Sequence, residues 1–202
     1  VKEHTDIPAG VFNVITSEDP ATVGDQLVAD PRVDMVSFTG STAVGKHIMS
    51  RASETVKKVF LELGGKSANI MLDDADLGSS LLSALAVCFH AGQGCALNTR
   101  LLIPRDRQGE VEELLKTYFG FISYGDPDSD SEIMGPLVNA RQRERVLGYI
   151  EQGKSEGARL LLGGGRPAQL EKGFYVEPTV FVDVTNEMTI AREDIVGSVL
   201  SV

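Results

Sequence analysis

The sequence predicts an α/β fold with a parallel, doubly wound sheet, and two observations point to this class. Short apolar runs of strand length alternate with longer segments of helical periodicity along most of the 202 residues. This alternation stops at Gly64-Gly65 and then starts again, which indicates two successive βα domains. We therefore expect a boundary there, with residues 1–63 belonging to one domain and residues 64–202 to the next.

The first domain is expected to alternate strands with helices. Pro8-Ala9-Gly10 leads into the apolar run Val11–Ile15, which reads as a buried strand. The helix expected at residues 22–29 should end at Asp30-Pro31, because the residue that precedes a proline disfavours helical conformation. The other expected elements are a helix at residues 42–52 and strands at residues 35–38 and 56–63.

The second domain follows the same alternation. Residues 77–89 form an apolar segment without a polar face, which predicts a buried helix capped by Asp73 or Asp74. Gly92-Gln93-Gly94 should end it. Pro178 interrupts the last β segment and suggests a bulge or an edge strand. The other expected elements are strands at residues 68–72, 101–103, 160–162 and 176–184 and helices at residues 105–118 and 139–156.

Composition argues against several classes of function. A net charge of −10 and a pI near 4.8 disfavour nucleic acid as a partner, because phosphate binding needs clustered Lys and Arg. No apolar run approaches the roughly 18 residues of a membrane-spanning helix. Two cysteines do not make a disulfide framework, so a cytoplasmic location is expected. The histidines show no metal-ligand spacing, and no metal is expected.

Glu62 and Cys95 are the residues that most strongly suggest chemistry. Glu62 ends an expected strand, where open α/β sheets bind ligands, and Cys95 follows a glycine-flanked loop that a substrate can approach. A thiol is intrinsically nucleophilic, and a nearby carboxylate can deprotonate the thiol or a water molecule. Taken alone, such residues are more often a small buried hydrophobe and a solvated charge. Cys88 is expected in the core, because it lies within the apolar helix.

The order of motifs along the chain resembles that of the aldehyde dehydrogenase superfamily. The paired segments LELGGK and GQGC are similar to the active-site signatures of that family. Six further segments follow the family's order: GVFNV, SFTGSTAVGK, GPLVNARQRERVLGYI, EGARLLLGGGRP, YVEPTVF and AREDIVGSVLSV. The resemblance implies that residues 1–63 are the C-terminal part of an NAD(P)-binding domain and residues 64–202 the N-terminal part of a Rossmann-like catalytic domain. It also implies truncation at both ends, because family members are more than twice as long.

By this resemblance, the reaction is the oxidation of a small-molecule aldehyde to a carboxylic acid with NAD or NADP. Cys95 would form a thiohemiacetal and then a thioester, and Glu62 would activate the water that releases the acid. The asparagine of the family's oxyanion hole would precede Val1. The full-length family forms homo-oligomers, and the segments that build them are expected to be absent here. The choice of aldehyde and the choice between NAD and NADP stay open.

The cofactor is expected to bind where a strand turns into a helix. Gly40 permits a tight turn there, and Ser41 can cap the helix, whose N-terminus attracts pyrophosphate. Such a turn is a weak signal alone, because its glycines often serve packing. By the resemblance, Phe38 lines the same cleft, the carbonyl of Leu63 holds the nicotinamide carboxamide, and the carboxylate of Asp194 lies at the ribose. The expected cofactor-binding residues are Phe38, Gly40, Ser41, Gly45, Leu63 and Asp194.

Three positions near the end of the chain depart from the family's pattern. Asp194 replaces a glutamate, Val196 an aromatic residue and Ser198 a proline. These changes predict weaker cofactor positioning, so a catalytically inactive remnant, which binds nucleotide weakly or serves as an interaction module, is one alternative. A relative that transfers the acyl group to coenzyme A is another, although Glu62 favours hydrolysis. Lys66 belongs to the LELGGK motif and is expected to be structural.

Overall fold

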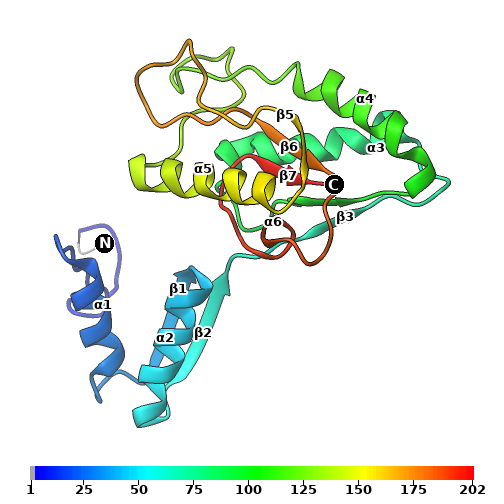
Figure 1. The fold of residues 1–202 in the computed structure, drawn as a ribbon. Helices are drawn as coiled ribbons and strands as arrows, with labels where there is room; N and C mark the ends of the chain where they lie inside the picture. Colours follow the sequence, from blue (N-terminus) through cyan, green and yellow to red (C-terminus); the bar gives the residue numbers. More distant parts are fainter. Residues whose placement is uncertain (1–2) are drawn as a thin grey trace. The chain divides into compact units, whose positions relative to one another are not determined.

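The computed structural model describes residues 3–202, and the chain divides into two compact units, Val1–Leu63 and Gly64–Val202 (Figure 1). Each unit contains a hydrophobic core of its own. Among the described residues, every helix is too short or too polar to cross a bilayer.

The first unit is a two-stranded parallel sheet with helices. Its elements are α1 (Pro20–Ala29), β1 (Met35–Gly40), α2 (Thr42–Ala52), the short 3-10 helix η1 (Ser53–Thr55) and β2 (Lys58–Leu63). The register of the two strands runs from Met35 opposite Lys58 to Gly40 opposite Leu63. Parallel strands need a long crossover connection, and α2 provides it.

Local sequence signals account for both helices of this unit. The Asp19 side chain accepts the N–H of Thr22 at 3.2 Å and caps α1, which ends before Asp30-Pro31 as predicted. Ser41 caps α2 by accepting the N–H of Val44 at 3.4 Å, also as predicted. The small core of the unit consists of Val28, Ile48 and Ala52, with Val36, Phe38, Val59 and Leu61 packed against it.

The strand predicted for residues 11–15 is wrong. The backbone there is irregular, and Val11, Phe12, Val14 and Ile15 are between 63% and 72% exposed. Among the described residues β1 pairs with β2 alone, so residues 11–15 lack a neighbouring strand. An apolar run forms a strand only where its backbone N–H and C=O groups find partners.

The second unit is built on a five-stranded mixed sheet with helices packed against it (Figure 1). Its strands, in chain order, are β3 (Ala68–Ile70), β4 (Arg100–Leu102), β5 (Arg159–Leu162), β6 (Thr179–Val182) and β7 (Val199–Ser201), and their spatial order is β3-β4-β7-β6-β5. Its helices are α3 (Leu77–Ser80), η2 (Leu81–Gly92), η3 (Arg105–Arg107), α4 (Gln108–Phe119), α5 (Ala140–Ser155) and α6 (Thr189–Arg192). The predicted α/β class is confirmed, although the edge strand β5 runs antiparallel to β6.

Strand β6 lies at the centre of the core of the second unit, and all four of its residues are buried. Helix α4 buries Val111 and Leu115, and helix α5 buries Val146 and Ile150. Residues four apart share one face of an α-helix, so each helix presents an apolar stripe to the interior. This spacing is the pattern from which both helices were predicted.

The buried helix predicted for residues 77–89 is present only in part. The short helix α3 passes into the 3-10 helix η2, which has three residues per turn. Leu81, Ala84 and Val87 therefore align on one side, and all three are buried, whereas Leu82 on another side is 53% exposed. A segment so rich in apolar residues contains too little periodicity to show which of its leucines faces outward.

The ends of this segment also differ from the prediction. The residue before α3 is Asp76, not Asp73 or Asp74, and its carboxylate accepts the hydroxyl of Ser79 at 2.7 Å. At the other end, residues 89–91 leave the helical conformation. The segment that carries Gly92 therefore starts with a distorted turn.

The interpretation of Pro178 was wrong as well. Strand β6 lies between β7 and β5, so it is not an edge strand, and Pro178 precedes its first residue. The irregular register falls between Leu160 and Leu162, in its pairing with β5. Proline lacks an N–H group, and it lies where the hydrogen-bonded ladder has not yet begun. Helix α6 and strand β7 follow in a segment for which no element was predicted.

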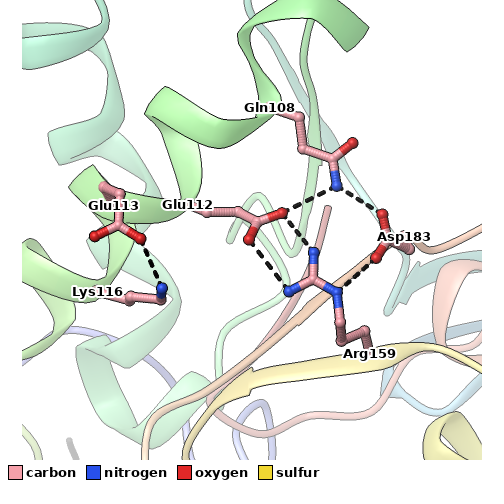
Figure 2. A network of polar contacts seen from close by, with 6 residues as sticks. All are labelled: Gln108, Glu112, Glu113, Lys116, Arg159 and Asp183. Atoms are coloured by element: carbon pink, nitrogen blue, oxygen red, sulfur yellow. Dashed lines mark hydrogen bonds and ion pairs between the residues drawn. The ribbon is translucent and has the colours of Figure 1, made fainter.

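A polar network joins β5, α4 and the residue that follows β6 (Figure 2). Arg159 donates to Asp183 at 2.7 Å and to both carboxylate oxygens of Glu112 at 2.6 and 3.2 Å. Gln108 donates to the same two carboxylates. Hydrogen bonds from Arg159 lower the pKa of Glu112, and those from Gln108 and Arg159 lower the pKa of Asp183.

Replacing Arg159 with methionine is expected to lower the melting temperature of the second unit by only about 2–4 °C, because water screens this half-exposed pair. Carboxylates with a lowered pKa stabilise the fold above their ordinary pKa and lose this contribution as the pH falls through the lowered value. The difference between variant and wild type should therefore shrink in acid.

Tyrosine fluorescence can follow this transition, because all four tyrosines lie in residues 64–202 and the chain has no tryptophan. Lys116→Met is the matched control: it removes the exposed pair between Lys116 and Glu113 (Figure 2) and should leave the melting temperature unchanged. A wild-type melting temperature for Arg159→Met at neutral pH would contradict the expectation.

Candidate active site

The two cysteines lie in opposite environments. Cys88 is buried, and burial raises the pKa of its thiol to about 12, so it stays protonated and closed to solvent. Cys95 is exposed on the loop that follows η2. This loop starts at Gly92, whose φ of +72° lies in the left-handed region that favours glycine. Of the two thiols, Cys95 is the one that a substrate can reach.

Gln93 fixes the loop through both ends of its amide group. Its Nε2 donates to the carbonyl of His90 at 2.9 Å, and its Oε1 accepts the N–H of Val138 at 2.9 Å. His90 and Ala91 have φ of +52° and +54°, which costs free energy for residues that carry a Cβ. Hydrogen bonds thus hold a strained turn directly ahead of Cys95.

The main chain of this loop packs against residues 194–198, which we call the 194–198 segment. A Cβ on Gly92 would overlap the carbonyl group of Gly197 and the nitrogen of Ser198. On another side of the segment, a Cβ on Gly197 would lie 2.6 Å from a methyl carbon of Val146 in α5. The loop that carries Cys95 and the segment that carries Asp194 are therefore in direct contact, with no room for a methyl group.

Helix α5 also holds the 194–198 segment by hydrogen bonds. Gln142 donates to the carbonyls of Ile195 and Val196 at 3.1 and 2.8 Å, and Arg145 donates to the carbonyl of Asp194 at 2.9 Å. Val196 is β-branched and has a φ of +58°, an uncommon conformation that needs support from its surroundings. Three bonds from one helix supply this support.

Gln142 and Arg145 were not singled out from the sequence. Their spacing of three residues places both on one face of α5, and this was the available signal. Their acceptors are backbone carbonyls, which leave no pattern in the side chains of the partner segment.

Asp194 is partly buried and packs against Gly64, where any side chain would overlap its carboxyl group. Burial raises the pKa of Asp194, and the positive charge of Lys66 opposes this shift. The structure thus places Asp194 against Gly64, in the same segment whose Gly197 and Ser198 contact Gly92 of the cysteine loop.

The other predicted site residues lie in the first unit. Strand β1 ends at Gly40, directly opposite Leu63 at the end of β2, and Glu62 is exposed one residue earlier. Ser41 begins α2 at the same end of this two-stranded sheet. The carboxyl ends of parallel strands, next to a helix N-terminus, form the usual ligand-binding edge of such sheets.

Two more of the predicted cofactor residues help to pack this edge. Gly45 is buried in α2, and a Cβ there would lie 2.9 Å from a methyl carbon of Leu63, so the glycine lets the helix approach β2 closely. Phe38 is half-buried against the core of the first unit. Both residues therefore have a packing role.

The clefts and possible metal sites of the described residues give no further support to the candidate site. Two open clefts on the second unit are lined by residues 70–74 with 102–104, and by residues 168–172 with Asp126 and Tyr175, and neither includes a predicted site residue. Within residues 3–202, no three His, Cys, Asp or Glu side chains are grouped so that they could hold a metal ion.

The profile of the aldehyde dehydrogenase family matches residues 1–202. A 3-succinoylsemialdehyde-pyridine dehydrogenase from a Pseudomonas species is 46% identical over 198 residues, which are 97% of this chain and 41% of that relative. The chain therefore spans about two-fifths of the length of the curated relatives that it matches.

Solved structures give the same result. An aldehyde dehydrogenase from Pseudomonas syringae, complexed with NAD⁺ and octanal, has a TM-score of 0.86 and 44% identity over 89% of this chain and 37% of its own. An aldehyde dehydrogenase from Mycobacterium tuberculosis, complexed with NAD⁺, has a TM-score of 0.85 and 46% identity over 88% of this chain and 37% of its own.

Proposed function

Because the chain belongs to the aldehyde dehydrogenase family, we propose that it carries the nucleophile and the general base of an enzyme that oxidises an aldehyde to a carboxylic acid with NAD or NADP. The observation that carries this proposal is the contrast between Cys95, exposed on a glycine loop, and Cys88, buried in the core. The proposal concerns part of such an enzyme, since the chain spans about two-fifths of its relatives.

Cys95 and Glu62 divide the chemistry between them. The Cys95 thiolate bonds to the carbonyl carbon of the aldehyde, and the carbonyl oxygen takes up the negative charge of a thiohemiacetal. NAD(P), when bound, supplies the hydride acceptor that converts this adduct into a thioester. Glu62 accepts a proton from the water that attacks the thioester carbon, and the carbon–sulfur bond then breaks to release the acid and restore Cys95.

Residues of each unit fit a part of the dinucleotide. The N-terminus of α2, which Ser41 caps beside Gly40, suits a pyrophosphate, because its first-turn N–H groups and dipole attract anions. The Asp194 carboxylate can accept hydrogen bonds from ribose hydroxyls. The carbonyl of Leu63 would hold the nicotinamide carboxamide, with Phe38 beside it. The two solved relatives are complexed with NAD⁺, which supports a dinucleotide as the cofactor.

Three further proposals concern the complete protein. It would act in the cytoplasm, as the two cysteines suggest, on a small-molecule aldehyde, and it would assemble as a homo-oligomer, as the family resemblance implies. Size-exclusion chromatography of the full-length protein tests the last of these.

A catalytically inactive, nucleotide-binding remnant is the second candidate. It is favoured by Val196 and Ser198, which stand where the family has an aromatic residue and a proline. Ser198 is buried, and its hydroxyl donates to the sulfur of Met134 at 3.1 Å, so the fold accommodates this change. The φ of +58° at Val196 makes that residue the less favourable of the two.

Competitive alkylation of the native chain tests the central observation. Limiting iodoacetamide, followed by mass spectrometry, should label Cys95 and leave Cys88 unmodified, because the Cys88 thiol is buried and protonated. Denaturing the chain before labelling provides the control, since both thiols should then react equally. Equal labelling in the native state would contradict the proposed nucleophile.

A further inference from the structure

Lys66 is a buried cation that the proposed chemistry leaves without a role. It follows Gly64-Gly65 and precedes β3. Its Nζ is buried and has no hydrogen-bond partner among the described residues. An ammonium group carries three donors, and burying it unpaired costs free energy unless an opposite charge compensates. Such a group suggests a function that depends on its charge.

Two charged groups face Lys66. Burial lowers the pKa of Lys66 to about 8; the Asp194 carboxylate opposes this shift, and the Arg100 guanidinium of β4 adds to it. The side chain is therefore charged at neutral pH and loses its charge above about pH 8. Asp194 is the negative charge that compensates it.

The charges that face Asp194 come from three segments. Lys66 and Arg145 lower the pKa of the carboxyl group, and the neighbouring Glu193 raises it. The Arg145 guanidinium is engaged by the Asp194 carbonyl at 2.9 Å and by the hydroxyl of Tyr149 at 3.2 Å. Of the two cations that face Asp194, Lys66 is the one whose donors have no hydrogen-bond partner, and the nearby Arg100 also has an unpaired Nε donor.

The backbone on both sides of this pair is fixed. Gly64 leaves room for the Asp194 carboxyl group, which any larger residue would displace, and Lys66 is only two residues further along. On the other side, α5 holds the carbonyl of Asp194 through Arg145. Lys66 Nζ makes no hydrogen bond with the carboxylate, so the two groups interact through their charges alone.

We infer that Lys66 is a positioning residue, whose buried ammonium keeps the Asp194 carboxylate charged and oriented to accept hydrogen bonds from the cis-diol of a nucleotide ribose. This inference rests on the proposed function for the ribose and adds a role for a lysine that the sequence alone marked as structural. The Lys66 ammonium group also keeps donors that no described residue accepts.

The pairing itself can be tested without any cofactor. In the 202-residue chain with ¹³C-labelled lysine, the Lys66 Cε resonance, assigned by its loss in Lys66→Met, should titrate near pH 8. In Asp194→Asn the midpoint should move to lower pH, because the carboxylate that favours the charged lysine is gone. An unchanged midpoint in Asp194→Asn would overturn the inference.

The consequence for binding is tested by NADH fluorescence across a pH series. Lys66→Met should raise the pKa of Asp194, so the acid limb of NADH binding moves to higher pH and the affinity there falls about fivefold or more. Lys66→Arg should restore the wild-type limb. A purely structural role for Lys66 would change the affinity equally at every pH, and that result would overturn the inference.

Tyrosine fluorescence during unfolding shows whether each variant folds; Lys66→Met should fold, because methionine is similar in length and the Asp194 carboxyl group, which loses that cation, is only partly buried. If the Lys66 titration depends on Asp194 but no variant binds NADH at any pH, the Lys66–Asp194 pairing still stands. That result would instead count against the proposed cofactor function.

Discussion

Cys95→Ser is expected to abolish the burst of NADH that an aldehyde dehydrogenase forms in its first turnover, and to lower kcat by about 10³-fold or more. A serine hydroxyl is a far weaker nucleophile than a thiolate at neutral pH, so the first covalent bond fails to form. The assay uses a hybrid enzyme in which this chain replaces the matching segment of a solved relative, with stopped-flow absorbance of NADH as the measurement.

Glu62→Gln should give a different result in the same assay. The thiol can still attack and the hydride can still leave, so the burst should persist, whereas the steady-state rate falls by about 10²–10⁴-fold, because the hydrolytic water has lost its base. Cys88→Ala is the matched control and should keep both phases, since Cys88 is buried away from the loop. A full burst in Cys95→Ser, or a lost burst in Cys88→Ala, would refute the assignment of the nucleophile.

Gly92→Ala is expected to destabilise the second unit by about 2–5 kcal/mol. The new methyl group would overlap the main chain of Gly197 and Ser198, and the φ of +72° disfavours any residue with a Cβ. Backbone atoms within a packed core have little freedom to move away, so the loop that carries Cys95 would be displaced.

Urea unfolding followed by tyrosine fluorescence measures this effect, because every tyrosine lies in the second unit. Gly148→Ala provides the control in the same unit. Gly148 is exposed within α5, and its Cβ would meet no atom within 4 Å, so alanine should stabilise the helix by about 0.5–1 kcal/mol. Equal stabilities for Gly92→Ala and wild type would show that the main-chain contact does not constrain the loop.

The parts of the fold that the sequence predicted well are those that local physics determines. Ser41 caps α2, Asp30-Pro31 ends α1, and the apolar spacing of α4 and α5 matches their buried faces. Each of these signals acts within a few residues of the chain. They therefore appear in the sequence whatever the rest of the molecule does.

The failures concern properties that depend on a distant partner. Residues 11–15 have the apolar content of a strand but no neighbouring strand to pair with. The direction of β5 depends on its pairing with β6, which a short apolar run cannot specify. In η2 the mostly apolar sequence gave no periodicity from which the exposure of Leu82 could be inferred.

The candidate site shows the same division. Cys95 and Ser41 were predicted from glycine spacing and cap chemistry, and the structure leaves the first exposed and makes the second a helix cap. Lys66 was expected to be structural, although it belongs to the LELGGK motif, and its relation to Asp194 crosses more than a hundred residues. Charge pairs of that kind become visible only once the chain has folded.

The contact between Gly92 and Gly197 has an evolutionary consequence. Main-chain segments meet there, and every amino acid has the same peptide group. Mutations at flanking positions can therefore change side chains without changing the distance between the two main chains. Side chains at positions 196 and 198 can thus change without altering this contact, whereas a Cβ at either glycine would meet a neighbouring residue. A survey of natural variants should therefore find both glycines retained where positions 196 and 198 differ.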